Sequence, residues 1–132
     1  MTVQRSATNL RVRYAETDKM GVVYYANYLV WFEVARTDLL RSLGWSYREM
    51  EVAGISLPVI EAHCEYQRPA RYDDEIEVRT EGQMLSPVRM QFKYTVVRED
   101  STVAASGHTV HAAVTAAGRV CRLPDRIRQV FA

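Results

Sequence analysis

The sequence predicts an α+β fold in which a curved antiparallel sheet of five to six strands wraps one long helix. Three observations support this prediction. Residues 29–43 have the apolar period of a helix, the segments on either side alternate between apolar and polar residues as half-buried strands do, and turns rich in glycine, proline or charge separate the later strands. The 132 residues are enough for one domain, which we expect to span residues 1–132.

The first strand is predicted over residues 10–14, before a turn at residues 16–18. Its apolar positions alternate with charged ones: Leu10, Val12 and Tyr14 against Arg11 and Arg13. This period of two is the pattern of a strand that buries one face and exposes the other.

The long helix is predicted to begin near Tyr25 and to end at Gly44, a residue suited to a helix C-cap. Its apolar face contains Leu29, Phe32, Ala35, Leu39 and Leu43. Four aromatic residues cluster at its start: Tyr24, Tyr25, Tyr28 and Trp31. One helix cannot bury all of them against a single sheet, and aromatic residues concentrate at protein interfaces, so we expect a homodimer.

Four further strands are predicted after a short polar segment, residues 46–54. They cover residues 60–67, 75–79, 88–96 and 102–115. The last of them is rich in small residues on both faces, which suits a central strand pressed closely against its neighbours. Pro124 is expected to open a short terminal helix, because proline fits the first helical turn.

Charge and composition exclude several classes of function. The 17 basic and 16 acidic residues are interspersed and give a net charge of +1, so we expect no binding to nucleic acid or to an anionic membrane surface. The longest apolar stretch, residues 21–32, is too short to span a bilayer, and residues 1–13 lack the apolar region of a secretion signal. We therefore expect a cytoplasmic protein, without membrane insertion, whose Cys64 and Cys121 stay reduced.

No metal or cofactor site is expected. His108 and His111 are three positions apart in a strand, so they face opposite sides of the sheet and cannot chelate one ion together. All three histidines, His63 included, are expected to be partly exposed strand residues. The sequence also lacks a glycine-rich phosphate loop and the Gly-x-Ser-x-Gly motif of serine hydrolases. Glu33 and Arg36 have the helical spacing of an ordinary ion pair.

Asp18 is the strongest candidate for a catalytic group. An aspartate before a helix is often only a cap, but Asp18 stands several residues ahead of the helical pattern, and Gly21 lets the chain bend between them. The first turn of the helix, near Tyr25, offers unpaired N–H groups and a positive dipole end, which suit a polarised carbonyl. A carboxylate opposite that end can attack the carbonyl or activate water, and acyl transfer requires both parts.

The segment from Tyr14 to Arg36, YAETDKMGVVYYANYLVWFEVAR, resembles the signature of the hot-dog-fold acyl-CoA thioesterases, specifically the 4-hydroxybenzoyl-CoA thioesterase group and its relatives associated with the Tol–Pal system. The segments CEYQRPARYDDEIEVRT and FKYTVVRED are also similar to this family, so the resemblance covers nearly the whole chain. It implies a long central helix wrapped by an antiparallel sheet, and dimers that sometimes double into tetramers. It also implies cofactor-free hydrolysis of an acyl-coenzyme A thioester at the dimer interface.

The resemblance implies roles for individual residues as well. Asp18 matches the family's catalytic aspartate, which acts as nucleophile or as general base. Tyr25 matches the residue whose backbone N–H polarises the thioester carbonyl. Gly21, Tyr24 and Asn27 fall at positions expected to shape the turn and the substrate pocket.

Two departures from the family pattern concern the substrate. Many Tol–Pal-associated members have a histidine where this chain has Tyr25, and the aromatic residue is closer to the aryl-CoA branch. That branch can hold the coenzyme A phosphates with a basic cluster near the start of the strand at residues 88–96, where this chain has Arg89 alone. Arg68 and Arg71 are alternative phosphate ligands. The acyl group, whether short aliphatic, long aliphatic or aryl, stays open.

Two other functions share this fold. A hot-dog dehydratase places a histidine beside its acid near the central helix, and this chain has no histidine before His63, which argues against that reaction. A non-catalytic subunit that binds acyl-CoA or an acyl carrier protein is the second alternative. Tight binding of acyl-CoA without release of thiol would favour that subunit.

Overall fold

The computed structural model describes residues 2–132 and confirms the α+β class. Its elements follow in the order β1 (Gln4–Arg11), the 3-10 turn η1 (Tyr14–Glu16), α1 (Asn27–Ser42), α2 (Tyr47–Ala53), β2 (Ile55–Ser56), β3 (Val59–Tyr66), β4 (Glu75–Ser86), β5 (Arg89–Arg98), β6 (Val103–Ala112), β7 (Val114–Thr115) and α3 (Asp125–Val130).

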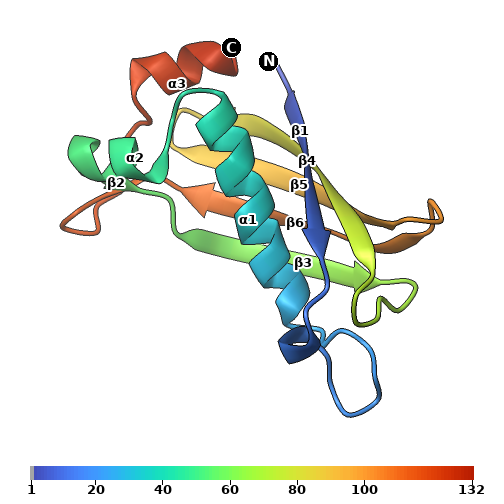
Figure 1. Ribbon diagram of the computed structural model, residues 1–132. Coiled ribbons are helices and arrows are strands. Elements are labelled where there is room, and N and C mark those ends of the chain that lie inside the picture. Colours follow the sequence, from blue (N-terminus) through green and yellow to red (C-terminus); the bar gives the residue numbers. More distant parts are fainter. Residues whose placement is uncertain (1) are drawn as a thin grey trace.

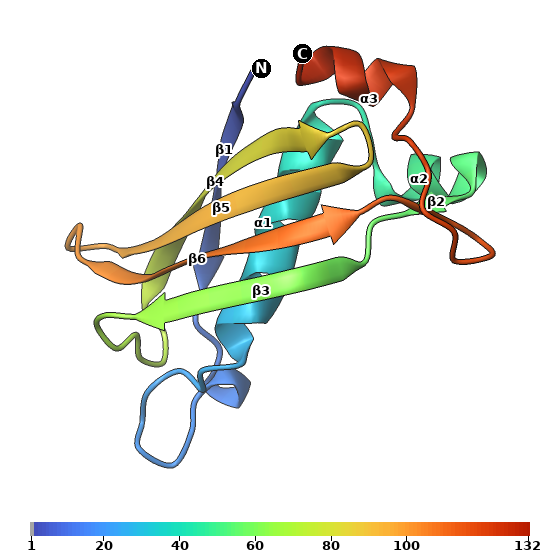
Figure 2. The ribbon, with the colours of Figure 1, turned by 180° about the vertical axis from the view of Figure 1, so that it is seen from behind.

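Five antiparallel strands form the main sheet in the order β1-β4-β5-β6-β3, and β2 pairs with β7 beside it. Helix α1 lies along one face of this sheet (Figure 1), and the view from behind shows the opposite face without a helix over it (Figure 2). The loop between η1 and α1 projects at one end of the helix, while α2, β2 and α3 gather at the other. The sheet therefore has two edges, β1 and β3, and two distinct ends.

The core lies between α1 and the sheet. Phe32, Ala35 and Leu39 are fully buried on the sheet side of the helix, and the Phe32 ring stacks on Tyr94 with centroids 4.1 Å apart. Leu29 was expected on this apolar face but is 40% exposed, because Tyr28 and Trp31 point towards the core in its place. Their bulk sets the rotation of the first turns of α1.

Several predicted boundaries were wrong. The first strand begins and ends earlier than residues 10–14, and α1 begins at Asn27 instead of near Tyr25. The polar segment 46–54 contains α2, whose N-cap is Ser46: the Ser46 side chain accepts a hydrogen bond from the Glu49 N–H at 3.3 Å. Such caps stabilise helices too short to have a clear apolar period.

Strand β4 continues through Gly82, where the sequence suggested a break. A Cβ at this position would lie 3.0 Å from Leu39 Cδ2 and 3.1 Å from Phe92 Cε1. The glycine therefore allows α1 and β5 to approach the strand closely, and it does not mark a turn.

The strand predicted to be central, β6, does lie inside the sheet. β6 lies between β5 and β3, with β7 following it after one residue. A Cβ at Gly107 of β6 would overlap the backbone carbonyl oxygen of His63 on β3 and would approach Phe32 Cε2 to 2.9 Å. Only a residue without a side chain fits between the helix and the edge strand here.

The histidines differ in their exposure. His108 and His111 face opposite sides of β6 as expected, but His111 is fully buried, so the expectation of partial exposure was wrong for it. Cys64 and Cys121 are free thiols. In residues 2–132, no cluster of three or more histidine, cysteine or acidic side chains is arranged to hold a metal ion. Within the same residues, no helix has the length and hydropathy needed to cross a bilayer.

Candidate active site

Asp18 lies at the base of a closed turn in the loop that leads to α1. Its carbonyl oxygen accepts a hydrogen bond from the Gly21 N–H at 3.0 Å, and its own N–H donates to the Val22 carbonyl at 2.9 Å. Gly21 has φ +80°, which a residue with a side chain would adopt only with strain. One carboxylate oxygen of Asp18 accepts from the Met20 N–H at 2.8 Å, while the other has no hydrogen-bond donor within residues 2–132. One carboxylate oxygen of Asp18 is thus hydrogen-bonded, and the other is available to a substrate or a water molecule.

The backbone N–H of Tyr25 is also available. Tyr24, immediately before it, donates its N–H to the Glu16 carbonyl at 2.8 Å, and the carbonyls of Tyr24 and Tyr25 accept from the first N–H groups of α1. In the part of the chain that the structure describes, the Tyr25 N–H donates to no acceptor. It is therefore an orphan donor at a helix start, as such positions commonly provide.

Asp18 and Tyr25 line the same cavity, which has a volume of about 340 Å³. Tyr28 of α1, Tyr66 at the end of β3 and Arg68 beyond it form other parts of its wall. The Tyr66 hydroxyl donates to the Tyr25 carbonyl at 3.0 Å. Burial and the neighbouring Cys64 raise the pKa of Tyr66 to about 12, so this hydroxyl stays a donor. A carbonyl polarised by the N–H and a carboxylate able to attack it can meet in this cavity.

Glu16 is a buried acid that the sequence did not mark as functional. Its side chain accepts hydrogen bonds from the Arg13 N–H at 2.8 Å and from the Trp31 indole N–H at 2.9 Å. Burial raises the pKa of the Glu16 carboxyl group, but these bonds and the Arg13 guanidinium outweigh that effect and hold the pKa below its ordinary value. Glu16 therefore stays ionised inside the protein.

The other expected site residues lie around the cavity or far from it. The Asn27 side-chain amide donates to the Glu16 carbonyl at 3.0 Å, and the Tyr24 ring packs against Tyr25 with centroids 4.6 Å apart, so both support the loop without lining the cavity. Arg89 opens β5 at the opposite end of the sheet. It pairs with Ala112 on β6, whereas Tyr66 pairs with Ala105, seven residues away. At ~3.3 Å per residue, Arg89 is about 23 Å from the cavity.

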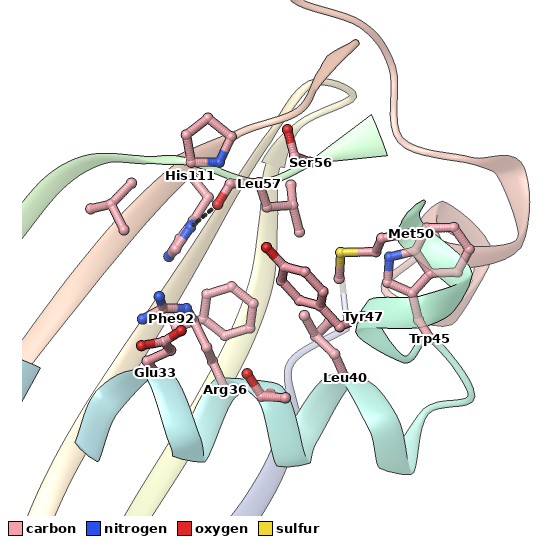
Figure 3. Close-up of a pocket in the computed structure, with 13 residues that line it drawn as sticks. Glu33, Arg36, Leu40, Trp45, Tyr47, Met50, Ser56, Leu57, Phe92 and His111 are labelled. Atoms are coloured by element: carbon pink, nitrogen blue, oxygen red, sulfur yellow. Dashed lines mark hydrogen bonds between the residues drawn. The ribbon is translucent and has the colours of Figure 1, made fainter. Parts of the chain in front are cut away.

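A second cavity of about 310 Å³ lies near that opposite end, between α1, α2 and the start of β3 (Figure 3). Its walls are mainly apolar, with Leu40, Trp45, Tyr47, Met50, Leu57 and Phe92 among the lining residues. Glu33 and Arg36 of α1 point into it (Figure 3). The ion pair expected between these two residues is not formed within 4.0 Å in residues 2–132.

A directed chain of hydrogen bonds forms the back of the second cavity. His111 bonds to the Leu57 carbonyl through Nδ1 at 2.8 Å and to the Thr109 hydroxyl through Nε2 at 2.8 Å. Because a carbonyl only accepts, Nδ1 carries the proton and Nε2 accepts from Thr109. The Thr109 oxygen then accepts from the Tyr94 hydroxyl at 2.7 Å. This direction is that of the neutral ring, because a protonated Nε2 would donate to the Thr109 hydroxyl instead of accepting from it.

His111 should make the protein less stable as the pH falls below about 6.5. Burial, followed by the charge of Arg36, lowers the pKa of His111 to about 4, whereas an unfolded histidine takes up its proton near pH ~6.5. The unfolded state then binds more protons than the folded state, so the free energy of unfolding should fall by about 2 kcal/mol between about pH 7 and about pH 5. Urea denaturation at both pH values measures this change.

The control is a histidine on the exposed face. The variant H111Q should lose most of the pH dependence, and H63Q should keep it, because His63 is exposed. An H111Q protein with the same slope as the wild type would show that other groups cause the change.

The fold defines the class of protein: a long helix enclosed by an antiparallel sheet is the arrangement of the hot-dog fold. The family model of the thioesterase-like superfamily matches residues 12–131. The chain therefore belongs to the thioesterase-like superfamily, and the hot-dog fold and the enzyme class predicted from the sequence, a thioester hydrolase, are confirmed.

Individual relatives agree with this assignment. The acyl-CoA thioester hydrolase YbgC of Escherichia coli is 34% identical over 94 residues, which are 71% of this chain and 70% of that protein. The 1,4-dihydroxy-2-naphthoyl-CoA hydrolase of Thermosynechococcus vestitus is 34% identical over 101 residues, 76% of this chain and 69% of that protein. A crystal structure of the DHNA-CoA thioesterase from Staphylococcus aureus is 35% identical, covers 96% of this chain and 90% of its own, and has a TM-score of 0.89.

Proposed function

We propose that this protein hydrolyses an acyl- or aryl-coenzyme A thioester to the free acid and coenzyme A. The observation that carries the proposal is the meeting of Asp18 and the Tyr25 N–H at one cavity, each with hydrogen-bonding capacity unused within residues 2–132. The thioester oxygen would accept from the Tyr25 N–H, which stabilises the negative charge that develops on it.

Two routes to products follow from this geometry. In the first, Asp18 attacks the thioester carbon, the carbon–sulfur bond breaks with release of the coenzyme A thiolate, and water hydrolyses the resulting anhydride. In the second, Asp18 takes a proton from water, that water attacks the same carbon, and the carbon–sulfur bond breaks as the proton passes from Asp18 to the coenzyme A thiolate. Both routes need the uncommitted carboxylate oxygen. Turnover in ¹⁸O-labelled water identifies the first route when water attacks the aspartyl carbonyl of the anhydride, because only that step incorporates the label into the Asp18 side chain.

We further propose that the working enzyme is at least a dimer joined along β3. This edge strand has no second neighbour in the described sheet, and its apolar side is uncovered: Ile60 and Tyr66 are each 49% exposed. Edge strands of this kind are templates for pairing. A two-fold pairing would extend the sheet and would cover the exposed apolar side chains, including those of the aromatic cluster. Pairing of two such dimers is the tetrameric alternative.

Two-fold pairing along β3 would also complete the site. In an antiparallel pair related by a two-fold axis, the start of each strand lies beside the end of the other. The end of β3 is at the Asp18 cavity, and its start is at the second cavity. The second cavity of one subunit would therefore adjoin the Asp18 cavity of its partner and hold the acyl group. The partner's Arg89 would lie at the same end and reach the coenzyme A phosphates.

Replacement of Arg89 by alanine tests the phosphate contact. We expect R89A to raise KM for acyl-CoA by about tenfold, the effect of one lost charged contact of about 1.4 kcal/mol, with kcat nearly unchanged. KM for the matching acyl-pantetheine thioester, which lacks the nucleotide phosphates, should not change. R79A, which removes another exposed strand arginine, is the matched control. Equal effects of R89A on both substrates would contradict a phosphate contact.

Release of free thiol from a panel of acyl-CoAs tests the function itself. The panel should contain short aliphatic, long aliphatic and hydroxyaryl thioesters, because the relatives are named for general acyl-CoA and for dihydroxynaphthoyl-CoA substrates. Release from any class supports the proposal and identifies the acyl group. Binding without release from every class would favour the alternative, a subunit that binds acyl-CoA or an acyl carrier protein.

A further inference from the structure

We propose that Glu16 is a positioning residue, which holds both Asp18 and the Tyr25 N–H in their working orientation. This inference rests on the proposed function, because it concerns the same two groups. Glu16 does not line the cavity and is only 5% exposed, so it acts through the loop and not on the substrate.

The main chain of Glu16 ties the two ends of the catalytic loop together. Asp18 follows Glu16 by two residues at the start of the loop. At the end of the loop, the Glu16 carbonyl accepts the Tyr24 N–H at 2.8 Å, one residue before Tyr25, and the Asn27 side-chain amide at 3.0 Å. Between these ends, Thr17 and Val23 form an isolated antiparallel bridge. The Glu16 carbonyl therefore joins the segment that carries Asp18 to the segment that carries Tyr25, with the Thr17–Val23 bridge beside it.

The side chain of Glu16 fixes the orientation of that carbonyl. It is anchored on α1 by the Trp31 indole and on the preceding segment by the Arg13 N–H and guanidinium. All of these partners are donors, and only an ionised carboxylate accepts from all of them. A glutamine has the same shape, but its NH₂ group would face one of the donors. The glutamine side chain must then turn away, and the carbonyl loses its anchor.

Measurement of kcat and KM of E16Q with the preferred acyl-CoA tests this role. We expect kcat to fall by about 10- to 100-fold, since a displacement of ~1 Å at a reacting group costs about that much. KM should change less than about threefold, because Glu16 does not contact the substrate. W31F removes a single donor from the carboxylate and should give a smaller loss of kcat, of about threefold to tenfold. If E16Q does not fold, W31F decides the question.

A matched control separates positioning from general loss of stability. T8V removes the hydrogen bond of 2.9 Å from Thr8 to Asp38, which joins β1 to α1 away from the loop. We expect T8V to lower the unfolding temperature while keeping kcat within about twofold. The proposal is overturned if E16Q keeps its kcat, or if T8V with the same loss of stability loses as much kcat as E16Q.

Amide hydrogen exchange gives a readout that does not depend on turnover. In E16Q without substrate, the amides of Met20, Gly21 and Tyr24 should exchange about tenfold faster or more than in wild type and T8V, because they are the bonded donors of the loop. This result would support positioning even if no acyl-CoA were hydrolysed, in which case only the proposed function would fail. Unchanged exchange of these amides in E16Q would overturn the positioning role.

Discussion

Replacing Asp18 with asparagine is expected to lower kcat for the preferred acyl-CoA by about 100- to 10 000-fold, the contribution of a positioned carboxylate base or nucleophile. Asparagine keeps a side-chain oxygen that can accept the Met20 N–H, so the closed turn should persist. The unfolding temperature should therefore stay within about 2 °C of the wild type, since Asp18 makes no other side-chain hydrogen bond in residues 2–132. Thiol release and a thermal melt on the same preparation measure both quantities.

A second turn aspartate provides the control for D18N. Asp73 is exposed, has φ 69°, and lies outside the cavity, so D73N makes the same chemical change without touching the site. D73N should keep full activity. If D18N retained most of its turnover, Asp18 would be a loop residue only, and another group would have to activate the attacking atom.

Replacing Gly107 with alanine is expected to cost about 3 kcal/mol of unfolding free energy, at the upper end of the usual effect of overpacking. The added methyl group would overlap the backbone carbonyl oxygen of His63, which cannot move aside as a flexible side chain can. Relief requires that β3 separate from β6 and that Phe32 shift from its stacked position on Tyr94. A loss of this size lowers the melting temperature by on the order of 10 °C for a chain of this length.

The neighbouring residue provides the control for G107A. Ser106 is next to Gly107 on β6, and its side chain accepts an exposed hydrogen bond from Gln67, so S106A should change the stability by less than about 1 kcal/mol. Because G107A displaces the edge strand, it should also weaken the dimer proposed along β3, which analytical ultracentrifugation measures. A G107A protein as stable as S106A would mean that β3 and β6 can separate slightly without loss.

The elements of the fold were predictable where one periodic pattern dominated. The helix with Phe32, Ala35 and Leu39 on one face was correct in type, as was the central strand with its small residues. The predicted boundaries of the elements were wrong where tertiary contacts determine them. Gly82 reads as a break in the sequence, but its meaning depends on the side chains of Leu39 and Phe92 that pack over it. Such contacts are long-range and leave no local pattern.

The two central residues of the candidate site could be predicted from the sequence, and the residues that hold them in place could not. The acid before the helix and the N–H at the helix start can be read from spacing and from the resemblance, and the structure brings Asp18 and Tyr25 to one cavity. Glu16 and Tyr66 were missed because their roles depend on partners far along the chain. One signal was available for Glu16: a buried tryptophan needs an acceptor for its indole N–H, and Glu16 is one of the two acids in the loop before the helix that carries Trp31.

The double attachment of the loop at Glu16 also limits how related sequences can diverge. Since the Glu16 carbonyl is bonded to Tyr24, the number of residues between these two positions sets the path of the chain past Asp18. Exposed side chains in this interval, such as Lys19 and Met20, can be exchanged without altering that path. An insertion or deletion of a single residue would alter that path. Over evolutionary time, this segment should therefore vary in composition and keep a constant length.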